Sequence, residues 1–109
     1  MNKQYSTDLI LNSIFDIMKY NTSQIILKHN LNSESRQQKK VFNRMFFCDY
    51  MVNNLGVQVE KIGLLINRHH SQVLYNVKQH QVLLNDKKYK SDTAELKQDL
   101  MTLTRIGKL

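Results

Sequence analysis

The sequence predicts an all-α domain, and three observations support this class. Apolar residues recur at intervals of three and four along almost the whole chain, which is the spacing of one helix face. There is no proline and there are only three glycines, whereas an all-β fold needs many tight turns. The 109 residues, of which 41% are apolar, suffice for one hydrophobic core. We therefore expect a single domain of about six helices and no strands.

The N-terminal third should hold two helices. The first follows an apolar stripe and has a Thr or Asp cap at its start, and the second is short. Polar residues typical of turns and loops lie after each of them. The expected order is a helix over Leu9–Tyr20 capped by Thr7 or Asp8, a turn at Asn21–Ser23, a short helix from there to near Asn30, and a loop at Asn32–Ser35.

A long helix and a pair of shorter ones should follow. Apolar residues at 4-3-4-3 spacing predict a helix over Arg36–Leu55, and Gly56 stands where a left-handed C-terminal cap is expected. A short helix covering Val59–Ile66 should turn at Asn67–Arg68 into a new helix that begins near His69 or His70. This new helix should point Val73, Leu74, Val77 and Leu84 inward and carry a polar stripe of His69, Gln72, Asn76 and Gln79.

The last expected helix runs over about 92–106. Asn85–Lys90 looks like a charged connection, and Ser91 or Asp92 with Glu95 is typical of a capped helix start. Leu96, Leu100, Leu103 and Ile106 would form the buried face of this helix.

The charge of the chain is +7 and is concentrated in two segments. Residues 34–44 carry four basic residues against one acidic residue, and residues 61–90 carry six against one. An excess of positive charge favours a polyanionic partner. Lysines can also serve only to keep a small protein soluble, but their clustering in two segments makes this explanation weaker. Lys61 and Lys78 are candidates for phosphate contacts on electrostatic grounds alone.

Several other classes are disfavoured. No stretch approaches eighteen apolar residues, and MNKQYSTD lacks the pattern of a secretory signal, so we expect a cytoplasmic protein. The acidic residues show no pair spaced for acid–base catalysis, and no Gly-rich loop could hold a nucleotide, so we expect no enzyme and no cofactor. His69, His70 and His80 lack metal-ligand spacing. Cys48 lies on an apolar stripe and should be a buried, inert thiol.

The short helix, turn and new helix over about 58–84 form the pattern of a helix-turn-helix. In that motif the N-terminal residues of the second helix contact base edges in the major groove of DNA. The residues available there are hydrogen-bond donors and acceptors suited to bases or phosphates, namely Arg68, His69, His70, Ser71 and Gln72.

The same residues carry a resemblance to a known family. Glu60-Lys61-Ile62-Gly63 followed by Arg68-His69-His70-Ser71-Gln72-Val73 resembles the signature of the C-terminal DNA-binding domain (domain IV) of the bacterial replication initiator DnaA. That family reads E-I-G-x-x-x-G-G-R-D-H-[ST]-T-V, followed by a basic helix. The order and lengths of the expected helices agree with it from about Thr7 to Leu103. The resemblance implies an all-α fold of the DnaA type, in the TrpR-like helix-turn-helix superfamily.

The resemblance also implies roles for individual residues. Arg68, His70 and Ser71 stand where the family contacts major-groove bases or neighbouring phosphates. Arg36, with Lys39 or Lys40, lies near the arginine of the family's basic loop, which enters the adjacent minor groove. Arg44 belongs to the same basic segment. The chain departs from the family's pattern at His69 and Gln72, where the family has Asp and a second Thr. It also has Asn67 in place of the Gly-Gly pair, and its turn is about one residue shorter.

We therefore expect a double-stranded DNA-binding domain without ATPase activity. It would act as a regulator or accessory factor in replication or transcription, for example of a phage or another mobile element. The alternative from a different class is a protein-interaction module that keeps the fold and binds a replication or transcription protein through the aromatic long helix, which carries Phe42, Phe46, Phe47 and Tyr50. Structured RNA is a third alternative, although no aromatic base-stacking motif supports it.

Overall fold

The computed structural model describes residues 21–107, and these residues form helices and no strand. The predicted all-α class is therefore confirmed for this part of the chain. Residues 21–29 are helical. The elements that follow are α2 (Gln38–Asp49), a π-helical turn η1 (Tyr50–Asn54), α3 (Val59–Ile66), α4 (His70–Leu83) and α5 (Lys87–Arg105).

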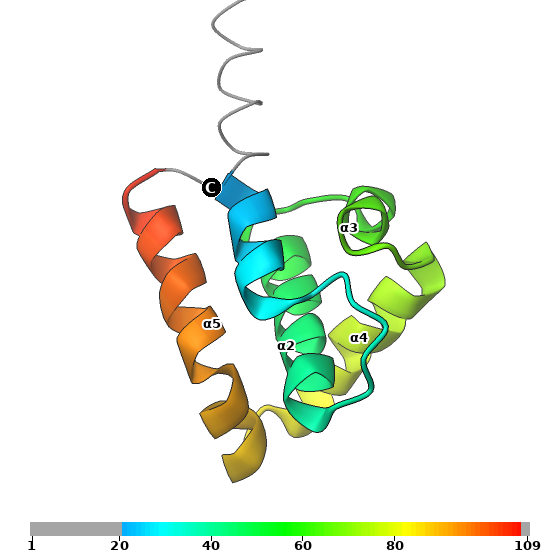
Figure 1. Cartoon of the computed structure of the whole chain (residues 1–109), viewed down its shortest axis with the longest axis vertical. Coiled ribbons are helices and arrows are strands. Elements are labelled where there is room, and N and C mark those ends of the chain that lie inside the picture. Colours follow the sequence, from blue (N-terminus) through cyan, green and yellow to red (C-terminus); the bar gives the residue numbers. More distant parts are fainter. Residues whose placement is uncertain (1–20, 108–109) are drawn as a thin grey trace, which may run out of the picture.

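Helix α2 is the central element of the fold. Figure 1 shows α5 on one side of α2, and α3 and α4 on the other. The side chains with the least exposure come from every one of these helices and form one cluster. Its fully buried members are Leu31, Phe47, Cys48, Ile62, Ile66, Val73, Leu96 and Leu100. Burial of these apolar groups around α2 holds the helices together.

Three helix ends depend on residues in the left-handed backbone region. Asn30, Gly56 and Asn67 have φ values of 53°, 67° and 57°, and each follows the last turn of a helix. Asn and Gly adopt this conformation at lower cost than other residues, which is why they end helices. The predicted helix end near Asn30, the cap at Gly56 and the turn at Asn67–Arg68 are confirmed.

Several predicted boundaries are wrong. Residues 21–23 are helical, because the burial of Ile25 and Ile26 in the core outweighs the weak helix propensity of Asn, Thr and Ser. Helix α2 begins at Gln38, two residues later than expected, and its last part is π-helical. The expected helix over Leu9–Tyr20 and its cap lie outside the described residues, so the count of about six helices stays a prediction.

The start of α5 is also earlier than predicted. The helix begins at Lys87, where the side chain of Asp86 caps it by accepting a hydrogen bond of 2.9 Å from the backbone N–H of Tyr89. Tyr89 is buried and packs edge-to-face on Phe42, with ring centroids 5.1 Å apart. With Asp86 as the cap, Tyr89 lies in the first turn, and Ser91 and Asp92 lie inside the helix. Among the described residues, no helix is long and apolar enough to cross a membrane.

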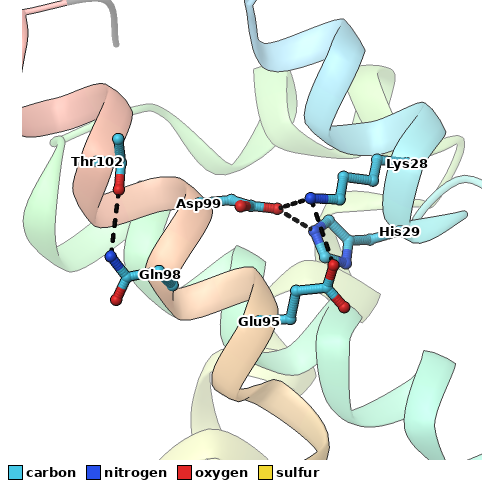
Figure 2. A network of polar contacts seen from close by, with 6 residues as sticks. All are labelled: Lys28, His29, Glu95, Gln98, Asp99 and Thr102. Carbon is cyan, nitrogen blue, oxygen red and sulfur yellow. Dashed lines mark hydrogen bonds and ion pairs between the residues drawn. The ribbon is translucent and has the colours of Figure 1, made fainter.

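Helix 21–29 is joined to α5 by a surface network of charged groups, shown in Figure 2. The carboxylate of Asp99 accepts hydrogen bonds from Lys28 at 2.9 Å and from His29 at 2.8 Å, and Lys28 also contacts Glu95 at 3.3 Å. Burial raises the pKa of Asp99, but the bonds from Lys28 and His29 outweigh this effect and lower it below 3.8. The network therefore links the two helices through an ionised carboxylate.

Candidate nucleic-acid interface

The turn between α3 and α4 brings the chain back onto α3. The backbone N–H of Arg68 donates a hydrogen bond of 2.8 Å to the carbonyl of Gly63. A Cβ atom at position 63 would lie less than 3.0 Å from the backbone carbonyl oxygen of Arg68. Only glycine allows this approach, so Gly63 explains how three residues suffice to connect the two helices.

The first residue after the turn, His69, caps α4. Its Nδ1 accepts a hydrogen bond of 3.2 Å from the backbone N–H of Ser71 and lies 2.8 Å from the hydroxyl of Ser71. With Nδ1 acting as acceptor, the Ser71 hydroxyl donates to it. The His69 ring also packs on the ring of His70, with centroids 4.1 Å apart. His69 therefore organises the start of α4, and its side chain and that of Ser71 remain exposed.

Arg68 is largely engaged with the protein itself. Its guanidinium donates hydrogen bonds to the carbonyls of Ile66 at 3.3 Å and of Asn67 at 2.9 Å, and a third bond to the carbonyl of Ser33. The first two bonds satisfy carbonyls at the C-terminal end of α3. The third bond fastens the turn to the loop that precedes α2. Arg68 thus positions the two segments, and it is only partly exposed.

The expectation that Arg44 contacts DNA is wrong, because its side chain is buried inside the domain. Its side chain is only 7% exposed. It donates hydrogen bonds to the carbonyls of Ser33 at 3.0 Å and Ser35 at 2.6 Å. Because these bonds hold the guanidinium under the loop, it cannot reach a phosphate outside. Burial and the nearby charge of Arg68 lower the pKa of Arg44.

The two arginines meet at one backbone atom, the carbonyl oxygen of Ser33. In the described part of the chain, neither forms an ion pair with an acidic residue. Within residues 21–107 their charges are therefore not paired with a carboxylate, and they add to the positive potential around the loop. They also fix the position of the loop relative to the N-terminus of α4.

The remaining basic residues that the sequence singled out are accessible. Arg36, Lys39, Lys61 and Lys78 are exposed, and Lys40 is partly exposed. Arg36 follows directly after the loop residues that the two arginines hold. Lys61 lies on α3 and Lys78 on α4. The structure thus brings the start of the basic segment, the turn and the N-terminus of α4 into one region.

The faces of α4 differ in part from the prediction. Val73 is fully buried as expected, but Asn76 is only 4% exposed and donates a hydrogen bond of 3.6 Å to the thiol of Cys48. Leu74, expected to point inward, is 46% exposed, and Leu84 is also exposed. We define the outer face of α4 as Ser71, Leu74, Tyr75 and Lys78. This face therefore contains two large exposed hydrophobic side chains, Leu74 and Tyr75. Sequence reasoning missed the exposure of Leu74.

His80 belongs to a buried polar network away from this region. Its Nδ1 lies 2.6 Å from the hydroxyl of Tyr89, and its Nε2 lies 3.2 Å from the carboxylate of Asp49. Asp49 also accepts hydrogen bonds from Asn53 and Gln81. Burial lowers the pKa of His80, and the charge of Asp49 offsets this only in part. The network is satisfied internally, so it supports packing of α2, α4 and α5.

Two further features concern metal binding and the reactivity of the cysteine. In residues 21–107, no three His, Cys, Asp or Glu side chains are grouped so that they could hold a metal ion. Cys48 is fully buried, and burial raises the pKa of its thiol to about 11. A thiol with such a pKa is protonated at neutral pH, which suits the expected structural role.

No protein-family model, no curated protein and no solved structure matches the chain. The likeness to DnaA domain IV therefore remains an expectation from the quoted motif.

Proposed function

We propose that this chain binds double-stranded DNA through a helix-turn-helix formed by α3 and α4, with the N-terminus of α4 in the major groove. The observation that carries the proposal is the clamp of Arg44 and Arg68 on the carbonyl of Ser33. It holds the loop leading to Arg36 beside the start of α4. A base-reading helix and a flanking basic segment can then engage adjacent parts of one duplex as a rigid unit.

The electrostatics of α4 support this orientation. Helix α4 contains no acidic residue, so nothing on it repels phosphates. Lys78 lies on its outer face, and its N-terminus carries the positive end of the helix dipole. Arg36, Lys39 and Lys61 add exposed positive charge nearby. Contacts of these side chains with phosphates would supply most of the affinity.

The internal bonds of the site divide the predicted residues into two groups. Arg68 and His69 act as positioning residues, since their polar atoms hold the turn and cap the helix. His70 and Gln72 are exposed in the first turn of α4 and have no side-chain hydrogen bond within the described residues, so they are the polar side chains available to base edges. We propose that such a domain serves as a regulator or accessory factor in replication or transcription.

The test is a DNA-binding measurement by fluorescence anisotropy as a function of salt, between about 50 and 200 mM. Two variants remove charge from the proposed face, Lys61→Gln and Lys78→Gln. A matched control, Lys97→Gln, removes the same charge from an exposed position on α5. Each variant on the proposed face should reduce the slope of log K against log salt by about 1, and the control should not.

Two outcomes would refute the proposal. One is the absence of binding to any duplex at the lowest salt concentration. The other is an equal loss of affinity for Lys97→Gln and for Lys78→Gln, because binding would then follow net charge and not a defined face. Arg68→Ala is a poor test, since the loss of three hydrogen bonds would disturb the turn itself.

The alternative of a protein-interaction module finds less support. It requires the long helix to present its aromatic residues, but Phe42, Phe47 and Tyr50 are buried in the core of the domain. Only Phe46 is partly exposed, at a hollow of about 660 Å³ between α5 and the C-terminal end of α4. The aromatic helix therefore serves packing more than partner binding.

A further inference from the structure

The apolar part of the outer face of α4 is not explained by phosphate contacts or by polar base reading. Leu74 is 46% exposed and lies one helical turn after His70 and one turn before Lys78. It belongs to the second turn of the helix, which still lies in the groove when the first turn contacts bases. With α4 docked in this way, the exposed side of Leu74 would face the groove.

We propose that Leu74 reads the 5-methyl group of a thymine in the major groove, so that the target site contains an A·T pair at the position opposite this residue. This inference rests on the proposed DNA-binding function and specifies which base one side chain selects. It assigns to an apolar residue a role in specificity that phosphate contacts of the charged residues do not supply.

The chemistry of the major groove favours thymine at this position. The thymine methyl is the only apolar group that a base edge presents there, whereas guanine, adenine and cytosine present hydrogen-bonding groups. Leu74 has no donor or acceptor, so placing it against one of those groups would remove water without replacing its hydrogen bond. Placing it against a methyl buries apolar surface on both sides.

Tyr75 does not fit the same role as well as Leu74. Its side chain is 50% exposed and lies near the direction of Ser71 on the helix, but it carries a hydroxyl. A phenol on the outer face of the helix can donate a hydrogen bond to a phosphate, and DNA-binding tyrosines commonly do so. Leu74 has no polar group of its own, so a thymine methyl is the contact that suits it.

The experiment begins with selection of the preferred duplex from random sequences by the full chain. Each thymine of the selected site is then replaced singly by deoxyuridine, which removes only the methyl group, and affinity is measured by anisotropy. Loss of one buried methyl should weaken binding of the wild-type protein about four-fold at one position. In Leu74→Ala, deoxyuridine at this position should have no effect.

Leu27→Ala is the matched control, because it removes the same exposed side chain from helix 21–29, outside α3 and α4. It should keep the wild-type response to deoxyuridine. A selected site without a methyl-sensitive position, or a response that persists in Leu74→Ala, would overturn the reading by Leu74 while leaving DNA binding intact. If no duplex is selected and none is bound at low salt, the proposed function itself fails, and the inference falls with it.

Discussion

Replacing Gly63 by alanine would test the close approach of the turn to α3. The new Cβ would lie less than 3.0 Å from the carbonyl oxygen of Arg68, a backbone atom that no side-chain rotation can move away. The turn would have to shift outward, and the 2.8 Å hydrogen bond from Arg68 N–H to the Gly63 carbonyl would lengthen. The same shift would strain the clamp between Arg68 and Ser33.

The expected loss of stability is the sum of two destabilising contributions and one stabilising contribution. Overpacking of this kind costs about 1–3 kcal/mol. A weakened hydrogen bond adds roughly 0.5–1.5 kcal/mol. Alanine recovers up to about 1 kcal/mol, because it favours the helix more than glycine does. We therefore expect Gly63→Ala to lower the free energy of unfolding by about 1–3 kcal/mol, and Tm by on the order of 10 °C for a domain of this size.

Thermal and urea unfolding followed by circular dichroism would measure this change. The matched control is Leu64→Ala at the next position, whose side chain is 85% exposed, and it should stay within about 0.5 kcal/mol of the wild type. Gly56→Ala is a second reference, because its Cβ would have no neighbour within 4 Å and would cost only the left-handed backbone, roughly 1 kcal/mol. A Gly63→Ala protein as stable as the wild type would refute the close approach.

Three other predictions concern titration and reactivity. Burial lowers the pKa of His80 below 6.5, so its contribution to stability is present above pH 6.5 and is lost as the pH falls from there through the lowered pKa. His80→Gln should flatten this dependence in thermal melts while His70→Gln keeps it, and a His80 pKa at or above 6.5 by NMR would contradict the reasoning. The lowered pKa of Asp99 contributes stability above pH 3.8 that is lost as the pH falls through the lowered value. Asp99→Asn should therefore cost about 1 kcal/mol at neutral pH and little at pH 2, and an equal cost at both values would argue against the ion pair. The Cys48 thiol, with a pKa of about 11, should fail to react with a disulfide reagent at pH 8 until the protein is unfolded, and rapid reaction of the native protein would show that it is accessible.

The predictions from sequence succeeded where the controlling interactions are local. Gly56 and Asn67 ended their helices as expected, because a left-handed backbone favours these residue types wherever they follow a helix. The apolar spacing located α3 and the start of α4 for a similar reason. The prediction from capping residues failed at Ser91 and Asp92, since Asp86 is an equally good cap and the packing of Tyr89 on Phe42 favours the earlier start.

The amino-acid sequence by itself determined the helical class, the turn between α3 and α4, and the clustering of positive charge, since periodicity, capping and charge are properties of neighbouring residues. Only the tertiary structure decided which of these residues are available. Arg68 bonds to Ser33, which is 35 positions away, and Asn76 bonds to Cys48, which is 28 positions away. Such partners are chosen by the packing of α2 against its neighbours. For this reason Arg44 became a buried brace and Leu74 became part of the outer face of α4.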